Sequence, residues 1–161
     1  MEVNSFYVSE NGQPIIPVTG EFHFSRYPEK EWEQSILKIK SGGVTVIPTY
    51  VFWNMHEENE NQFRWDGNLN LRKFIEICRQ HDMRVIVRIG PFCHGEIRNG
   101  GLPDWILAKP MEVRSNDDKY LFYVKRLYNE IGKQLNGLYY KDGGPIIGIQ
   151  IENEHQHSAA P

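Results

Sequence analysis

A short hairpin pattern opens the chain. Residues 6–8 and 14–16 form two apolar segments that flank Asn11 and Gly12. An Asn-Gly pair between apolar segments favours a two-residue turn, because both residues tolerate the positive φ that such turns require. The pattern therefore predicts a β-hairpin over residues 5–16.

Strand and helix patterns alternate along the rest of the chain. The strand patterns are continuous apolar runs, whereas the helix patterns repeat apolar residues every three or four positions. Strands are predicted at residues 17–24, 44–50, 84–89 and 145–152, and helices at 29–41, 69–81 and 117–136. Strands that are apolar on both faces indicate a sheet covered on both sides, as parallel sheets are.

Each predicted helix carries an apolar stripe that is expected to face the core. The stripes consist of Trp32, Ile36 and Ile39 in the first helix, of Leu71, Phe74, Ile75 and Cys78 in the second, and of Leu121, Val124, Tyr128, Ile131 and Leu135 in the third. Boundary signals agree with these ranges: Pro28 suits a first helical turn, Gly42 stops the first helix, and residues 115–118 offer a cap and acidic side chains to the third.

The predicted fold is α/β, with about four strand–helix units of which the fourth lacks its helix. Residues 20–23 contain no glycine-rich turn, which argues against the dinucleotide-binding form of a doubly wound sheet. Polar residues follow every predicted strand, and a (β/α)8 (TIM) barrel gathers its chemistry at that end of its strands. A complete barrel takes ~250 residues, so we expect residues 1–161 to form one partial domain, the first half of a barrel preceded by the hairpin.

The polar residues expected along the rim of this barrel are Glu21, His23, Asn54, His56, Glu57, Glu96, Glu152 and Glu154. Alternation along the last strand places Ile147, Ile149 and Ile151 on the helix-packed face and Gly148, Gln150 and Glu152 on the interior face. Glu154 has the same parity as Glu152, so both carboxyls are expected in the mouth. A carboxyl there can protonate a leaving oxygen. The alternative is a solvated strand end, where glutamate is common.

Composition and charge indicate which classes of partner the chain can bind. The net charge is −3 without a basic stripe, so a nucleic-acid partner is not expected. No apolar run approaches the length of a membrane span. Residues 1–5 lack the basic and apolar regions of a signal peptide, but a periplasmic or secreted parent with a trimmed leader would look the same, so the compartment stays open. The aromatic content of 12% fits either core filling or the stacking of sugar rings.

The sequence gives little support for a metal site, a disulfide or a Ser-His-Asp catalytic site. His23, His56 and His94 lie on three different loops without short ligand spacing, so no metal site is predicted. Cys78 and Cys93 show neither metal nor disulfide spacing. A Ser-His-Asp site would need a G-x-S-x-G turn, which is absent.

Five blocks, in this order and spacing, resemble glycoside hydrolase family 35, the β-galactosidases. The blocks are residues 20–26 (GEFHFSR), 49–57 (TYVFWNMHE), 90–96 (GPFCHGE), 100–105 (GGLPDW) and 143–154 (GGPIIGIQIENE). Each block alone is a weak signal, but together they are specific. The resemblance runs from about residue 12 to the C-terminus.

The resemblance implies a retaining exo-enzyme that removes terminal β-galactose without a metal or organic cofactor. Glu154 corresponds to the family's proton donor, and Asn153, Tyr50 and Glu96 correspond to its sugar-binding residues. In this mechanism one carboxyl of raised pKa protonates the glycosidic oxygen while a second, ~5 Å away, attacks the anomeric carbon.

Two departures from the family pattern touch the sugar pocket. His155 stands where the family usually has Tyr, and His94-Gly95 stands where Ala or Asn-Ala commonly precedes the binding Glu. The family nucleophile, a second Glu, would lie past Pro161. We therefore expect the 161 residues alone to be catalytically incomplete, with the missing C-terminal half of the barrel as a partner. Uncovered strand edges would favour aggregation or pairing.

Two other functions remain open at this point. A same-fold alternative is an exo-β-glucosaminidase, which some relatives of the family are. A different class is a non-catalytic remnant that binds sugar or protein, for which the missing nucleophile is itself the sequence signature.

Overall fold

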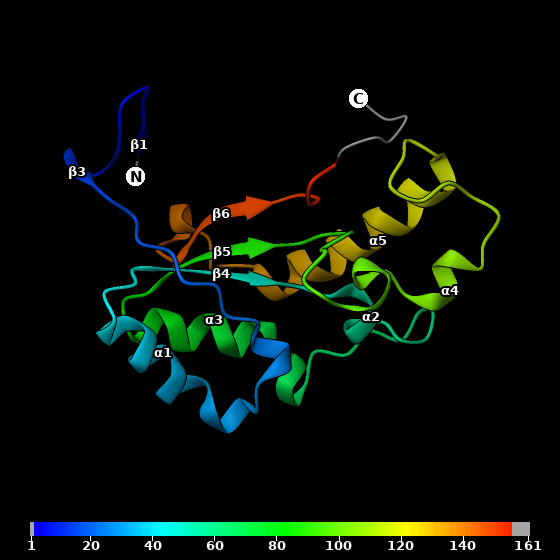
Figure 1. The fold of residues 1–161 in the computed structure, drawn as a ribbon, viewed down its shortest axis with the longest axis horizontal. Helices are drawn as coiled ribbons and strands as arrows, with labels where there is room; N and C mark the ends of the chain where they lie inside the picture. Colours follow the sequence, from blue (N-terminus) through cyan, green and yellow to red (C-terminus); the bar gives the residue numbers. More distant parts are fainter. Residues whose placement is uncertain (1, 156–161) are drawn as a thin grey trace.

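A three-stranded parallel sheet organises the molecule, whose computed structural model describes residues 2–155. The strands are β4 (Val46–Tyr50), β5 (Arg84–Arg88) and β6 (Ile146–Gln150), in the order β4-β5-β6. Three helices join and cover them, namely α1 (Trp32–Ser41), α3 (Leu71–Gln80) and α5 (Asp118–Leu135) (Figure 1). The predicted alternation of parallel strands and helices is therefore confirmed for these elements.

The N-terminal hairpin is also confirmed. Strands β2 (Val8–Glu10) and β3 (Gln13–Ile15) pair antiparallel around Asn11 and Gly12, which both have positive φ. A third strand that the sequence did not predict, β1 (Glu2–Val3), pairs with β2.

The strand predicted at residues 17–24 is wrong as a regular element. This segment forms only an isolated parallel bridge between Thr19 and Val46. The amide groups of Gly20 and Phe22 still donate to the carbonyls of Val46 and Pro48, so the segment runs beside β4. It has no second neighbour among residues 2–155, and Phe24 already begins a 3-10 helix.

Short helices connect these elements. They are η1 (Phe24–Arg26), η2 (Glu29–Glu31), α2 (Trp53–His56), η3 (Gly67–Leu69), η4 (Arg98–Gly101), α4 (Asp104–Leu107) and η5 (Tyr140–Asp142). The sequence patterns did not indicate them, because a helix of one turn is too short to show a period.

The helix stripes bury one face of the parallel sheet. In α3 the predicted stripe is correct: Leu71, Phe74, Ile75 and Cys78 are fully buried. The Asn70 side chain accepts from the amide of Lys73 and so caps the helix. In α5 the predicted Val124, Ile131 and Leu135 are buried, but Tyr120 and Leu127 are buried as well, whereas the predicted Leu121 is 42% exposed.

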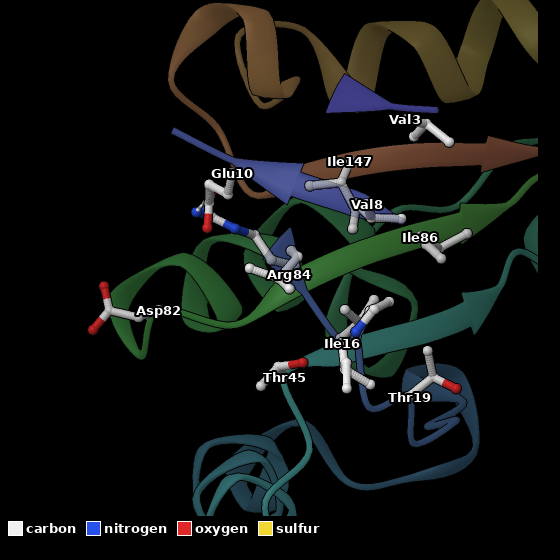
Figure 2. Close-up of a pocket in the computed structure, with 13 residues that line it drawn as sticks. Val3, Val8, Glu10, Ile16, Thr19, Thr45, Asp82, Arg84, Ile86 and Ile147 are labelled. Carbon is white, nitrogen blue, oxygen red and sulfur yellow. Dashed lines mark hydrogen bonds and ion pairs between the residues drawn. The ribbon is translucent and has the colours of Figure 1, made fainter. Parts of the chain in front are cut away.

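The opposite face of the sheet lines a cavity of about 700 Å³ beneath the hairpin (Figure 2). Val8 of the hairpin, Ile86 of β5 and Ile147 of β6 face this cavity. The prediction that Ile147 shares a face with Ile149 is therefore wrong, because the β5–β6 register shifts between Val85 and Ile86.

The two other predicted helix-facing isoleucines are not covered either. Ile149 is 41% exposed and Ile151 is 65% exposed. In the part of the chain that the structure describes, β5 is the only strand that pairs with β6, and the other side of β6 has only an isolated bridge between Ile146 and Tyr139. No helix among residues 2–155 is both long and apolar enough to cross a membrane.

Candidate active site

The carboxyl ends of the three parallel strands carry the candidate site. Tyr50 is the last residue of β4, and Asn153 follows β6 by three positions. The Tyr50 hydroxyl donates to Asn153 Oδ1 at 2.9 Å, and both residues are buried. The structure thus brings together two of the four site residues that the sequence predicted.

Arg88, the last residue of β5, lies between them. Its Nη2 donates to Asn153 Oδ1 at 2.7 Å, and its guanidinium carbon lies 3.7 Å from the centroid of the Tyr50 ring. Its other terminal nitrogen pairs with the Glu21 carboxylate. Sequence analysis missed Arg88, although an arginine that ends an apolar strand next to a predicted barrel mouth was a usable signal.

The predicted acid, Glu154, lies at the outer edge of this group. Its side chain is 68% exposed, and its Oε2 lies 3.6 Å from Nδ1 of His94. The same His94 nitrogen lies 3.3 Å from Nδ2 of Asn153. Glu154 is therefore adjacent to the Asn153–Tyr50 pair but open to solvent on its other side.

The side chain of Glu96 is exposed and makes no hydrogen bond or ion pair with Tyr50, Asn153 or Glu154. Glu96 belongs to a turn, residues 94–96, in which all three residues have positive φ. The Arg26 guanidinium holds this turn by donating to the Gly95 carbonyl and, at 3.3 Å, to the Glu96 carbonyl. A side chain at Gly95 would meet the Phe52 ring at 2.9 Å, so the close approach of this turn to the segment that follows β4 requires glycine.

The Glu96 charge acts on His23, a predicted rim residue whose ring lies 5.3 Å from that of Tyr50. Burial lowers the pKa of His23, and the Glu21 and Glu96 carboxylates partly oppose this effect. Burial also raises the pKa of Tyr50 to about 12, so its hydroxyl keeps its proton at any physiological pH.

Glu152 does not face the mouth with Glu154, so that prediction is wrong. Its carboxylate pairs with Arg114, at 2.9 Å from Nη2 and 3.3 Å from Nε. The strand ends at Gln150, and Glu152 and Glu154 both have positive φ, so strand alternation no longer applies to them. Arg114 also donates to the Asn153 carbonyl at 2.9 Å and thereby holds the segment that carries Glu154.

His56 and Glu57 do not reach the rim either. Both side chains are fully buried. Glu57 accepts from Nε1 of Trp53 at 2.7 Å and pairs with Arg126 of α5. His56 stacks on Trp65, with 4.3 Å between ring centroids, and burial lowers its pKa to about 4. Asn54, the third predicted rim residue of this segment, donates to the Arg98 carbonyl.

The described residues offer no site for a metal or a thiol nucleophile. No group of three or more His, Cys, Asp or Glu side chains among residues 2–155 could hold a metal ion. Burial raises the pKa of Cys78 and of Cys93 to about 12, so both remain neutral thiols near neutral pH. What the site offers is an exposed carboxyl next to a buried amide and a phenol, which can donate a proton and bind hydroxyl groups.

Solved structures place this fold among the TIM-barrel glycosidases. An exo-β-1,4-mannosidase from Opitutaceae bacterium strain TAV5 superposes with a TM-score of 0.74 at 17% sequence identity. The match covers 96% of this chain and 28% of the mannosidase chain. A β-galactosidase from the psychrophilic Marinomonas ef1 matches 86% of this chain and 22% of its own with a TM-score of 0.61 at 14% identity. The chain therefore has a partial α/β fold with a parallel sheet that matches about a quarter of each of these larger chains.

Sequence comparison defines the family. A family profile described as "Glycosyl hydrolases family 35" matches residues 7–160, and the chain belongs to this family. The β-galactosidase of Canis lupus familiaris is 37% identical over 147 residues, which is 91% of this chain and 22% of the relative. β-Galactosidase 11 of Oryza sativa subsp. japonica is 39% identical over 150 residues, which is 91% of this chain and 18% of the relative. The chain spans about a fifth of the length of these curated relatives.

Proposed function

We propose that the chain is part of a retaining exo-β-galactosidase, in which it supplies the proton donor and part of the galactose pocket. Glu154 protonates the glycosidic oxygen, while Asn153, Tyr50 and Glu96 bind the sugar. The observation that carries the proposal is that Nδ1 of His94 lies 3.6 Å from the Glu154 carboxylate and 3.3 Å from the Asn153 amide, whose Oδ1 accepts from Tyr50. The named activity of the relatives points the same way.

Residues 1–161 would then supply about the first four strand–helix units of the barrel, without the helix of the fourth. The segment at 17–23, which runs beside β4 without forming a regular strand, takes the place of the first barrel strand, and β4, β5 and β6 are the second to fourth. The hydrogen bonds from Gly20 and Phe22 to the carbonyls of β4 support this arrangement, because they continue the sheet past β4. On this view the interior face is the face of the sheet that lines the cavity shown in Figure 2.

The attacking carboxylate comes from outside these residues. Two of the other carboxylates near the site are already engaged, because Glu21 pairs with Arg88 and Glu152 with Arg114. Glu96 is assigned to binding the sugar. We therefore propose that the 161 residues alone do not hydrolyse galactosides efficiently.

The test is hydrolysis of nitrophenyl β-galactoside by the full-length parent and by the 161-residue chain. Glu154→Gln in the parent should lower kcat at least 100-fold, since general acid catalysis contributes about 10²–10⁴-fold. The matched variant Glu33→Gln removes an exposed carboxyl on α1 and should leave kcat unchanged. A fully active Glu154→Gln parent would refute the assignment of the proton donor.

Two comparisons separate the rival functions. Faster hydrolysis of nitrophenyl β-glucosaminide than of the galactoside by the parent would favour the exo-β-glucosaminidase. A gene that stops in frame after residue 161, together with soluble expression of the chain, would favour a binding remnant. Activity of the 161 residues that Glu154→Gln abolishes would refute the inactivity proposed above.

A further inference from the structure

We infer that Arg88 is a positioning residue that fixes the orientation of the Asn153 amide and so decides which group this residue offers to the sugar. The inference rests on the proposed function, because it takes Asn153 as a galactose-binding residue. Its structural part, the control of the amide by Arg88, can be measured without any ligand.

The donors around Asn153 determine which way the amide points. Its Oδ1 accepts from Tyr50 at 2.9 Å, from Arg88 at 2.7 Å and from Nε2 of Gln150 at 3.3 Å. The guanidinium of Arg88 carries only donors, so Nδ2 of Asn153 cannot take the place of Oδ1. The bond from Arg88 is both the shortest of the three and the charge-assisted one.

Arg88 is itself held on two sides. The Glu21 carboxylate pairs with one terminal nitrogen, and the Tyr50 ring lies against the guanidinium plane at 3.7 Å. The Arg88 side chain is only 17% exposed. A planar, fork-shaped cation can bridge a carboxylate, an aromatic face and an amide oxygen at once, whereas a lysine ammonium acts as a point charge.

The consequence concerns the ligand. Oδ1 of Asn153 accepts from Tyr50, Arg88 and Gln150. Its Nδ2 therefore remains on the side of His94 and Glu154, where it lies 3.3 Å from Nδ1 of His94. Asn153 therefore presents a donor to the mouth. The group that it recognises must be an acceptor, such as the oxygen of a sugar hydroxyl.

Strand β5 offers a matched control. Arg84 lies on the same face of β5 as Arg88, four positions earlier, and also pairs with a glutamate, Glu10. It lies at the amino end of the strand and lines the cavity beneath the hairpin (Figure 2). Arg84→Met thus removes a comparable side chain from the opposite end of the sheet.

The first experiment follows the Asn153 side-chain amide in the ¹⁵N-labelled 161-residue chain by NMR, with the resonance assigned from its loss in Asn153→Asp. Arg88→Met should shift this resonance, because Oδ1 of the same amide loses its shortest, charge-assisted hydrogen bond. Arg84→Met should leave it unchanged. An unchanged amide in Arg88→Met would overturn the inference.

Arg88→Lys is a second variant that tests the inference if Arg88→Met does not fold. It keeps the buried charge opposite Glu21 but cannot reproduce the planar fork, so it should move the Asn153 resonance in the same direction by less. A resonance that stays in place in Arg88→Lys, in a chain whose other amides are native, would also overturn the inference.

The second experiment measures galactose binding by the full-length parent. Arg88→Met should weaken binding about tenfold, and Asn153→Ala should add little in the Arg88→Met background, because both changes remove the same interaction. No binding by the unmodified parent, with an Asn153 amide that still responds to Arg88→Met, would refute the proposed function alone. Normal binding by Arg88→Met would refute the inference alone.

Discussion

The hydroxyl of Tyr50 donates to Oδ1 of Asn153 at 2.9 Å across 103 positions of sequence. This bond joins the ends of the first and third strands of the sheet, β4 and β6, past the intervening β5. Both partners are buried, so water does not compete for it. The hydrogen bond therefore contributes to the fold as well as to the candidate site.

Tyr50→Phe should destabilise the chain by about 1 kcal/mol, the usual net value of one buried hydrogen bond. The cost stays small because Arg88 continues to donate to Asn153. Urea unfolding measures it, with Tyr7→Phe as the control, since Tyr7 is 47% exposed. Equal unfolding midpoints for the two variants would show that the bond contributes nothing.

His56 should make the chain less stable in mild acid. Burial lowers the pKa of His56 to about 4 in the folded chain. As pH falls below 6.5, His56 is therefore protonated in the unfolded chain but stays neutral in the folded chain. The contribution of His56 is thus fully present above pH 6.5 and is lost as pH falls towards 4, by about 1.4 kcal/mol per pH unit.

His56→Phe should flatten that slope, because phenylalanine cannot take up the proton and can keep the stacking on Trp65. Urea unfolding at several pH values between 7 and 4 measures it. The more exposed His81, which lies beside Glu33 on the surface, provides the control substitution His81→Gln. An identical slope in His56→Phe and the unmodified chain would contradict the argument.

The buried pair of Glu57 and Arg126 should be costly to break. Glu57→Gln leaves a largely buried guanidinium without its counter-charge, which typically destabilises a protein by about 3–5 kcal/mol. The surface pair of Glu130 and Lys133 is the control, and Glu130→Gln should cost less than about 0.5 kcal/mol. Thermal unfolding of the two variants gives the comparison, and similar losses would contradict it.

Arg114 and Glu152 should be energetically coupled. Both side chains are about four-fifths buried, and Arg114 also holds the backbone that leads to Glu154. A double-mutant cycle of Arg114→Met and Glu152→Gln should give a coupling free energy of about 1–2 kcal/mol. Additive effects would mean that the pair does not order the segment.

The sequence predicted the regular elements well where a period is long enough to read. The α3 stripe from Leu71 to Cys78 is an example, because four apolar residues at helical spacing leave little choice. The strand prediction at 17–24 was wrong because this segment hydrogen-bonds to β4 on one side and has no strand on its other side among residues 2–155. A strand prediction cannot tell whether both neighbours of a strand are present.

The site was predicted in part. Tyr50 and Asn153 lie together because parallel strands bring their carboxyl ends to one edge. His56 and Glu57 were misplaced because a polar residue after a strand can turn towards solvent or into a helix layer, and the local pattern is the same. Arg88 was missed because a charged strand end looks solvated until its three partners are known.

The N-terminal hairpin forms the floor of the sheet's interior face. Glu10 ties it to Arg84 of β5, and Val8 covers apolar side chains such as Ile86 and Ile147 (Figure 2). A truncation that starts at Pro17 would uncover this face at the end opposite the candidate site. Such a chain should self-associate through the bared apolar surface while the candidate site keeps its contacts.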